Sequence, residues 1–436
     1  MGNTAASPVS TASPASTAAA AAAPGTVYDV IVVGGGMVGS ALACALGEHG
    51  LDVALIEAEP VPPLMAGEPA AARVSAISAV SQRILARLGA WPAIEQLPGA
   101  GGGAPEPRVC AYTDMEVWDA SGPGLIHFDA AGIGEPALGW IIENRVIQSA
   151  LLARAATIDA LDVYPGVAVT GFEEGRNALG VQLADGRRLS ARLLVGADGA
   201  QSPLRAWAGI DTMGWGYEQQ AVVCRVRCEQ PHHDTCWQRF LPGGPLAFLP
   251  MYDGSCSIVW SCSRAQARQV LALDDAGFAH ALGEAFSHRL GPVLWSGPRA
   301  AFPLRLQHAQ HYVQPRVALV GDAAHVVHPL AGQGVNLGLL DAAALAELLI
   351  ERHGAGQDIG AIAGLRRYER ARKGDNLLMQ AAMDGFKRLF GSPLAPVVFA
   401  RNAGLLATNA LGPLKHLFAR RALGFGRELP ALARPG

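Results

Sequence analysis

Apolar residues near the start of the chain are grouped in two short runs with a helix-like segment between them. Residues 28–33 (YDVIVV) and residues 51–57 (LDVALIE) are continuous enough to indicate buried parallel strands. A glycine-rich turn and an Ala- and Leu-rich segment that ends near His49 separate the two runs. This order predicts a strand, a helix and a second parallel strand, which together form a β-α-β unit.

Later segments extend this sheet and add another layer. Residues 192–199 (RLLVGADG) and 316–322 (RVALVGD) predict two more strands, each of which ends in Gly and Asp. Residues 219–260 are rich in Val, Phe, Trp and Pro-Gly turns, and they predict antiparallel strands of a different sheet. After Leu365 the pattern becomes helical. We find no repeat with a period of 20–50 residues, which argues against a solenoid or a propeller.

Composition then narrows the class of protein. The chain has 436 residues, 50% of them hydrophobic, and a formal net charge of -3, so it is long enough for two or three globular domains. Nucleic-acid binding through bulk positive charge is excluded. Residues 1–25 have no charged side chain and almost no large apolar one, so we expect a disordered, low-complexity extension there.

The cysteines and the lengths of the apolar runs indicate the cellular compartment in which the protein works. The seven cysteines are an odd number and are irregularly spaced, which favours a reducing compartment over a disulfide framework. No stretch approaches the roughly 18 consecutive apolar residues that a spanning helix needs. We therefore expect a cytoplasmic protein, with peripheral association at the inner membrane left open.

The glycine-rich turn matches a dinucleotide fingerprint. Gly34, Gly36 and Gly39 fit G-x-G-x-x-G between a predicted strand and a predicted helix, and Glu57 follows at the end of the second strand. We expect these glycines to admit a pyrophosphate at the helix N-terminus and Glu57 to accept hydrogen bonds from ribose hydroxyls. A carboxylate also repels a 2′-phosphate, so the pattern favours FAD or NAD over NADP. The alternative is a glycine-rich turn that binds no nucleotide.

Two later segments carry a family resemblance. Residues 196–205 (GADGAQSPLR) and 321–336 (GDAAHVVHPLAGQGVN), together with the fingerprint, resemble the three motifs of single-component, FAD-dependent aromatic hydroxylases. Asp322 ends a predicted strand, where it can accept hydrogen bonds from hydroxyls of an extended FAD. A new helix is expected to begin at residues 332–336, with its N–H groups near the flavin ring. The resemblance implies ring contacts by these residues: Pro329, Gly332, Gly334, Val335 and Asn336.

Other residues in these motifs have competing interpretations. The resemblance puts Asp198 near the FAD pyrophosphate, but an Asp at a strand end also commonly caps the next segment, and Arg205 has the same ambiguity. His325 and His328 have the spacing of a catalytic pair. Flavin hydroxylation needs no metal, however, and loop histidines that hydrogen-bond the backbone are the more ordinary interpretation.

Five further strings, in order, resemble ubiquinone-biosynthesis hydroxylases, and the likeness covers about residues 26–424. The resemblance implies that Arg73 and Arg145 contact the cofactor, and that Phe240, Leu249 and Pro250 belong to a wall over the flavin that contacts the substrate. Gly35 departs from the Ala that is frequent at its position in related fingerprints. The strings are RVSAIS (73–78), LGAW (88–91), ENRVIQ (143–148), WQRFLPGGPLAFLP (237–250), and one late stretch that runs from MDG (383–385) to RRA (420–422).

Two other clusters remain to be interpreted. Cys228, His232, His233 and Cys236 lie within nine residues, but their spacing matches no common zinc-site pattern, so we predict no metal. Leu411, Leu414, Leu417 and Phe418 recur at helical spacing beside Lys415, His416, Arg420 and Arg421. That pattern indicates either a packed terminal helix or a basic amphipathic surface for a membrane or a partner.

The fold that follows is α/β. It comprises a glutathione-reductase-like FAD-binding Rossmann domain, a smaller mixed β-sheet substrate domain and a C-terminal helical segment. We assign residues 26–110, 138–212 and 302–366 to the FAD-binding domain, 111–137 and 213–301 to the substrate domain, and 367–436 to the helical segment.

The resemblance implies a monooxygenase that uses O2, with NAD(P)H or another donor as reductant. Because the sequence has no second dinucleotide fingerprint, NAD(P)H is expected to bind only transiently. The implied substrate is a lipophilic quinone precursor, a polyprenylated phenol, approached from a membrane surface or within a ubiquinone-biosynthesis complex. A soluble hydroxylase of small phenols and a non-catalytic flavoprotein scaffold remain the alternatives. The sequence does not choose between NADH and NADPH, nor the ring carbon that is hydroxylated.

Overall fold

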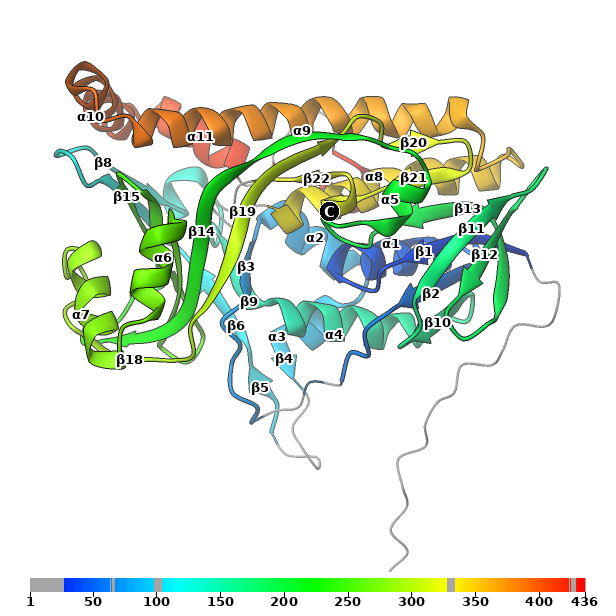
Figure 1. Cartoon of the computed structure of the whole chain (residues 1–436), viewed down its shortest axis with the longest axis horizontal. Helices are drawn as coiled ribbons and strands as arrows, with labels where there is room; N and C mark the ends of the chain where they lie inside the picture. The colour runs from blue at the N-terminus through cyan, green and yellow to red at the C-terminus, as the bar shows by residue number, and fades with distance from the viewer. Residues whose placement is uncertain are drawn as a thin grey trace, which may run out of the picture.

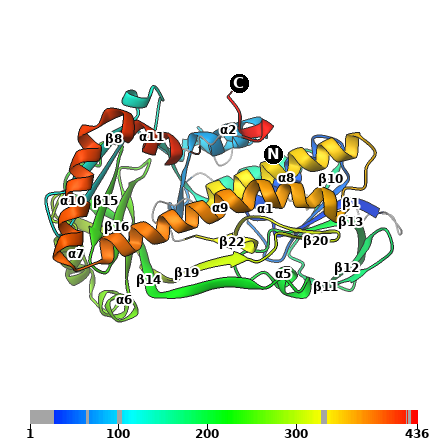
Figure 2. The same cartoon turned by 90° about the horizontal axis from the view of Figure 1, so that it is seen from above.

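The structure is a computed structural model that describes residues 27–62, 64, 67–97, 104–327, 334–422, 424 and 429–435. The predictions for residues 1–25, Pro329, Gly332 and His328 therefore lie outside the described residues. Two large sheets lie at opposite ends of the molecule, and one long helix passes over both of them (Figures 1 and 2).

The first sheet is built around five parallel strands. The predicted β-α-β unit is confirmed as β1 (Val27–Val33), α1 (Met37–Gly47) and β2 (Val53–Glu57). The parallel order is β10-β2-β1-β13-β21, so the fingerprint turn and the segment before Asp322 lie at the carboxyl edge of one sheet. The other strands of this sheet are β10 (Leu161–Pro165), β11 (Val169–Glu174), β12 (Leu179–Leu183), β13 (Arg188–Gly196), β20 (Val313–Gln314) and β21 (Val317–Leu319).

Continuous burial explains why these strands are apolar runs rather than alternating ones. Residues 28–33 of β1 and 53–56 of β2 are buried, because helices cover the sheet. α1 is buried over nine of its residues and packs against α4 (Asn144–Ala155) and α8 (Gly334–Gly354).

The second sheet is mixed. The antiparallel strands predicted within residues 219–260 are confirmed, although the first of them already begins at Thr212 and β15 also pairs in parallel with β7. Two strands from residues 114–129 join this sheet; the exact domain boundaries stay a prediction. Its strands are β7 (Asp114–Asp119), β8 (Leu125–Asp129), β14 (Thr212–Cys228), β15 (Thr235–Leu241), β16 (Gly244–Pro250), β17 (Cys256–Ser263), β18 (Val293–Ser296), β19 (Ala300–Ala309) and β22 (His325–Val326).

Smaller elements connect the two sheets. β3 (Val74–Ile77), β6 (Val109–Tyr112) and β9 (Gly139–Glu143) form a three-stranded sheet between them. The short helices are α2 (Ala79–Arg87), α3 (Trp91–Glu95), α5 (Pro203–Trp207), α6 (Arg264–Leu271) and α7 (Asp275–Ala285), with single turns η2 (Ala131–Ile133) and η3 (Gly321–Ala323), and β4 (Gln96–Leu97) pairs with β5 (Glu106–Pro107).

Helices form the end of the chain, as predicted. α9 (Ile362–Gly391) is the long helix over both sheets, and α10 (Ala395–Ala410) and α11 (Gly412–Ala422) follow it beside the second sheet (Figure 2). The chain then returns to the first sheet, where η4 (Ala431–Ala433) packs on α2 and α8. Of the helices that the structure describes, none combines the length and apolar character needed to cross a membrane. The predicted α/β fold with a second mixed sheet and a helical end is confirmed.

Candidate functional site

The fingerprint turn is shaped by close backbone packing. Gly34 has φ +108°, and its N–H donates to the carbonyl of Ile56 at 2.8 Å. A Cβ on Gly39 would lie 1.9 Å from the carbonyl oxygen of Gly34, so α1 can begin this close to the strand only with glycine there. A Cβ on Gly35 would lie 2.9 Å from Cβ of Glu57, which gives a steric reason for the absence of Ala at this position.

Gly36 differs from its neighbours. It is the N-cap residue of α1 and provides no side-chain cap, and a Cβ placed on it would have no protein atom within 4 Å. The glycine is therefore not required by packing within the described protein. Open space beside a helix N-terminus whose N–H groups lack a side-chain partner fits a dinucleotide pyrophosphate.

Glu57 is oriented by the same turn. Its Oε2 accepts from the N–H of Gly35 at 2.7 Å, and its Oε1 accepts from the N–H of Glu59 at 2.9 Å. The half-buried carboxylate keeps lone pairs for ribose hydroxyls after making these two bonds. Contact between Glu57 and a ribose stays a prediction.

Two arginines were expected at the cofactor. The guanidinium of Arg73 is exposed and lies 5.2 Å from the ring centroid of Phe302, at the wall of the main cavity. Arg145, in the first turn of α4, forms an ion pair with Glu68 at 3.0 Å. The structure thus places Arg73 beside the cavity and Arg145 on a surface ion pair.

Asp198 has a structural role that the sequence had left as an alternative. Its Oδ2 accepts from the N–H of Leu204 at 3.1 Å, in the first turn of α5. Its buried Oδ1 lacks a hydrogen-bond partner among the described residues, and burial raises the pKa of the carboxyl group. Arg205 joins this turn to the Asp322 segment, because its guanidinium donates to the carbonyls of Ala323 and Ala200 at 2.9 and 3.0 Å.

Asp322 lies in η3, at the edge of the same cavity. Its side chain is exposed to the cavity, and it has no hydrogen bond to any residue that the structure describes. The surrounding protein displaces water and raises the pKa of Asp322, while His325 and Arg73 oppose that effect. A carboxylate held here without a partner fits hydroxyl donors of an extended cofactor.

The start of α8 is tied to β3 and α2. Asn336 is buried; its Oδ1 accepts from the N–H of Ser78 at 3.0 Å, and its Nδ2 donates to the carbonyl of Ala76 at 2.8 Å. Gly334 and Val335 precede it in the first turn. The amide of Asn336 therefore fixes the helix start, and flavin contact by Gly334, Val335 and Asn336 stays a prediction, as it does for Pro329 and Gly332 outside the described residues.

His325 points into the protein rather than toward a reacting group. Its Nε2 lies 2.5 Å from Oδ2 of Asp341. The other oxygen of this carboxylate, Oδ1, accepts from Nε of Arg372 at 2.9 Å and from Nδ2 of Asn376 at 3.1 Å. This buried network was not predicted from the sequence. The available signal was a single carboxylate, Asp341, inside an otherwise apolar helical stretch.

The cavity that adjoins Asp322, which we call the main cavity because it lies beside the cofactor residues, is between the Asp322 segment and the second sheet and has a volume of about 430 Å³. Of the three predicted substrate residues, Leu249 is in its wall. Phe240 stacks instead on Phe390, with ring centroids 3.8 Å apart, and neither Phe240 nor Pro250 lines the cavity. Side chains from the second sheet, β3, β6, the residue after β22 and α11 make up most of the wall, among them Tyr112, Met115, Phe128, Trp237, Gln238, Val259, Phe302, Val327, Phe418 and Ala419.

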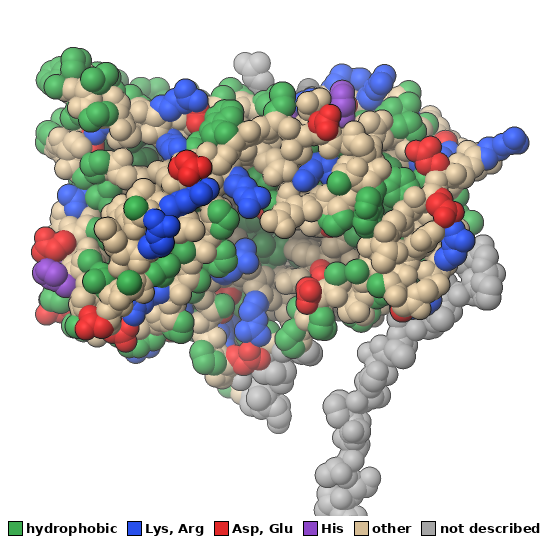
Figure 3. Space-filling view, in the orientation of Figure 1, with side chains coloured by type: hydrophobic (Ala, Val, Ile, Leu, Met, Phe, Trp, Pro, Cys, Tyr) green, Lys and Arg blue, Asp and Glu red, His purple; other side chains and the backbone are tan. Residues whose placement is uncertain are grey.

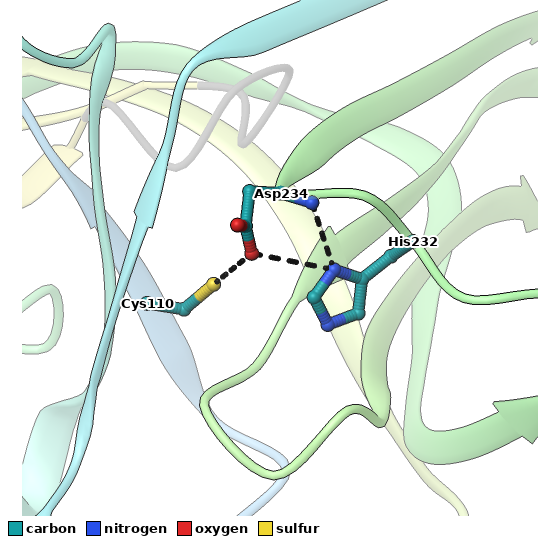
Figure 4. Close-up of side chains that lie close together, drawn as sticks. All are labelled: Cys110, His232 and Asp234. Carbon is teal, nitrogen blue, oxygen red and sulfur yellow. Dashed lines mark hydrogen bonds and ion pairs between the residues drawn. The ribbon is translucent and has the colours of Figure 1, made fainter.

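One cluster away from these residues has metal-ligating groups. Cys110, His232 and Asp234 lie together where β6 approaches the turn before β15 (Figure 4). Nδ1 of His232 accepts from the N–H of Asp234 at 3.1 Å, and its Nε2 lies 3.2 Å from the carbonyl of Met251. Burial and Asp234 raise the pKa of the Cys110 thiol to about 12, so it remains a neutral donor to Asp234 at 3.5 Å. These hydrogen bonds hold the turn before β15 in place, which is a structural reason for the three side chains to lie together.

Comparison with known proteins gives consistent matches along nearly the whole chain. The profile of a family described as FAD binding domain matches residues 27–374. The ubiquinone hydroxylase UbiL of Rhodospirillum rubrum is 41% identical over 94% of this chain and 93% of its own length. The 3-demethoxyubiquinol 3-hydroxylase of Escherichia coli is 40% identical over 91% of this chain and 98% of its own. The mitochondrial ubiquinone biosynthesis monooxygenase COQ6 of Rattus norvegicus is 39% identical over 89% of this chain and 90% of its own length.

Solved structures share the fold at low sequence identity. p-Nitrophenol 4-monooxygenase PnpA from Pseudomonas putida DLL-E4 superposes with a TM-score of 0.75 and 19% identity, over 92% of this chain and 99% of its own. HpxO of Klebsiella pneumoniae, solved with FAD and uric acid, has a TM-score of 0.69 and 20% identity, over 91% of this chain and 97% of its own.

Proposed function

Because the chain belongs to the FAD-binding-domain family, among its ubiquinone-biosynthesis hydroxylases, we propose that it inserts one oxygen atom of O2 into the ring of a polyprenylated ubiquinone precursor. FAD, when bound, supplies the redox chemistry, with NAD(P)H or another donor as the source of electrons. The observation that carries this proposal is the cavity beside Asp322. It is bordered by the proposed cofactor residues on one side and by apolar side chains that can pack against an aromatic ring on the other.

The residues present fit FAD. The turn from Gly34 to Gly39 would hold the pyrophosphate at the start of α1, Glu57 would hold ribose hydroxyls, and Asp322 would accept from the hydroxyls of the flavin side chain. Two observations support this assignment: the open space at Gly36 and the absence of a hydrogen bond from Asp322 to any described residue. Arg73 lies at the same edge and adds positive charge near the phosphates.

The chain itself contributes enclosure and orientation. The cavity wall is mostly apolar, which excludes water from the ring, and Leu249 contributes to it. Tyr112 and Gln238 are among the polar side chains that line it, and burial raises the pKa of Tyr112 well above its usual range. A neutral Tyr112 hydroxyl remains a hydrogen-bond donor at physiological pH and would orient the phenolic oxygen of the substrate.

The substrate also determines where the enzyme works. A polyprenyl tail resists transfer to water, so we place the protein peripherally at the cytoplasmic side of the inner membrane or in a lipid-binding biosynthetic complex. The Phe240–Phe390 stack and Pro250 lie outside the cavity wall and would support it from behind.

A single-turnover experiment tests the function independently of the electron donor. The FAD-loaded enzyme is reduced by dithionite without O2, mixed with a ubiquinone precursor that has a short prenyl tail, and then exposed to O2. The proposal expects a product heavier by one oxygen atom, with that atom derived from labelled O2. Oxygenation of small phenols alone would indicate the soluble hydroxylase, and reoxidation without any oxygenated product would indicate the scaffold.

A further inference from the structure

Exposed apolar side chains gather on the two helices that follow α9. Phe399 of α10 is 78% exposed, and Leu394, just before the helix, is also exposed. Leu406 of α10, Leu411 between the two helices and Leu417 of α11 are also exposed. Figure 3 shows the α10 end of this region as a group of hydrophobic side chains at the upper left. We call these residues the α10–α11 face; exposed apolar residues gathered on neighbouring helices are typical of contact with another protein or with lipid.

The α10–α11 face is fixed in place by buried polar bonds on its inner side. Nε of Arg401 lies 2.6 Å from Oδ2 of Asp119, at the end of β7. Asn402 donates to the same carboxylate at 2.8 Å and accepts from the N–H of Gly124 at 2.6 Å. α10 is thus anchored to the β7–β8 hairpin, so its exposed residues belong to a packed helix.

α11 belongs both to this face and to the main cavity. Phe418 and Ala419 line the cavity, yet the Phe418 side chain is 47% exposed at the molecular surface. The next turn toward the N-terminus of α11 carries Leu414, and Leu417 adjoins Phe418. Phe418 therefore stands where the cavity meets the exposed apolar face.

The charge of this region suits an anionic surface. From Gly385 to Ala422 the sequence contains no Asp or Glu. Of the basic residues there, Arg401 is neutralised by Asp119, Arg388 lies 2.7 Å from Asp384, and Lys415 lies 3.7 Å from Asp129. The basic residues of the segment are Lys387, Arg388, Arg401, Lys415, Arg420 and Arg421. Exposed apolar side chains in a segment whose own charged residues are all basic are typical of helices that bind anionic bilayers.

We propose that the isoprenoid tail of the substrate leaves the cavity past Phe418, follows α11, and enters an anionic lipid bilayer on which the α10–α11 face rests. This inference depends on the proposed function for the identity of the tail. A cavity of about 430 Å³ cannot hold a long polyprenyl chain, so most of that chain must emerge. Emergence at Phe418 puts the tail against apolar side chains and then into lipid, so its contact with water stays small.

The tail path is tested by changing the passage at Phe418. We compare kcat/KM of the holoenzyme for precursors with a single isoprene unit and with a long polyprenyl tail, both in detergent. Phe418→Trp should lower the ratio of long-tail to short-tail kcat/KM by about tenfold, because the larger ring narrows the exit. Leu294→Trp, on the exposed side of β18 and outside this region, should leave the ratio unchanged. An unchanged ratio in Phe418→Trp, with normal FAD content, would overturn the path.

Lipid contact is tested separately from catalysis. The holoenzyme is sedimented with vesicles of phosphatidylcholine, with and without phosphatidylglycerol. The wild type should bind the mixed vesicles more strongly, and Phe399→Ser with Leu417→Ser should weaken that binding by about tenfold. Leu294→Ser is the matched control, since Leu294 is 66% exposed. Equal loss in the control, or wild-type binding to neither vesicle, would overturn the lipid assignment, as would a wild-type oligomer that the double variant converts to monomers.

The two proposals fail in different ways. Loss of ring hydroxylation on every precursor, with vesicle binding intact, would reject the proposed function and leave the lipid contact standing. Normal hydroxylation of short-tailed precursors without vesicle binding would reject the lipid contact alone.

Discussion

Nε2 of His325 lies 2.5 Å from Oδ2 of Asp341, in the interior behind the Asp322 segment. Asp341 also accepts from the N–H of Gly321 at 3.2 Å, the residue directly before Asp322. Arg372, from α9, completes the ion pair at 2.9 Å. One buried carboxylate thus joins β22, α8 and α9 to the backbone that positions a candidate FAD residue, and His325 is a positioning residue rather than a catalytic one.

Replacing this carboxylate should destabilise the protein. Asp341→Asn leaves the buried guanidinium of Arg372 without its buried counter-charge, and breaking a buried pair in this way costs about 3–5 kcal/mol. Urea unfolding at neutral pH measures the loss. Asp375→Asn is the matched control: Asp375 is exposed and lies 3.3 Å from the same guanidinium, so its loss should stay within about 0.5 kcal/mol. Equal effects of the two variants would contradict this assignment.

The same carboxylate should make stability depend on pH. Although burial alone would raise the pKa of Asp341, His325 and Arg372 lower it to about 2 from its ordinary 3.8. The folded state therefore takes up this proton at lower pH than the unfolded chain does. The resulting stabilisation, about 2 kcal/mol, is complete above about pH 4 and is lost as the pH falls toward 2. The difference in unfolding free energy between wild type and Asp341→Asn should narrow over that range, whereas a constant difference would count against it.

The fingerprint glycines should separate cofactor binding from folding. Gly36→Val should abolish FAD binding yet leave the melting temperature of the apoprotein nearly unchanged, because a Cβ there meets no protein atom within 4 Å. Gly39→Val should lose both, since its Cβ would lie 1.9 Å from the Gly34 carbonyl oxygen. Flavin absorbance and apoprotein melting measure the two effects. A Gly36→Val protein that binds FAD normally would show that the turn is only structural.

The parts of the fold that could be predicted are those with a local signature. The β-α-β unit has continuous apolar strands and a glycine turn whose spacing reflects backbone contacts, so Gly34 and Gly39 lie where the pattern required. Asp322 follows a buried strand, and parallel strands bring their carboxyl ends to one edge. These inferences need no knowledge of distant partners.

The buried networks could not be predicted, because their members come from remote segments. Asp341 and Arg372 lie on different helices, and Asp119 is 282 residues from Arg401. Leu249 and Phe240 were equally plausible wall residues from the sequence. Their places are decided by their positions along their strands: Leu249 lines the cavity, whereas Phe240 stacks on Phe390. The periodicity at residues 411–418 predicted a helix without deciding its role, and α11 proves to be both cavity wall and exposed surface.

The two strand-end aspartates should respond differently to truncation. Asp322→Ala should raise the FAD dissociation constant by about tenfold or more, the loss expected for a charged hydrogen bond worth about 1.5–3 kcal/mol. The apoprotein should melt normally, because no described residue hydrogen-bonds Asp322. Asp198→Ala should destabilise the apoprotein by about 1 kcal/mol, because it removes the acceptor for the N–H of Leu204 in α5. An apoprotein melting loss in Asp322→Ala as large as in Asp198→Ala would make Asp322 a folding residue.

Arg401 should hold the helical end of the chain without contributing to FAD binding. Its guanidinium pairs with buried Asp119 and donates to the carbonyls of Leu389 and Phe390, at the end of α9. Arg401→Met would leave Asp119 buried with Asn402 as the remaining side chain that hydrogen-bonds it among the described residues, at a cost of about 3–5 kcal/mol. Since these contacts belong to the second sheet and α10, the helices should become protease-sensitive in urea before flavin is released. Arg388→Met removes an exposed ion pair with Asp384, so it should leave the urea midpoint of proteolysis and the urea midpoint of flavin release unchanged. Release of flavin at the same urea concentration as proteolysis of α10 in Arg401→Met would mean that the two regions unfold as one unit, against this expectation.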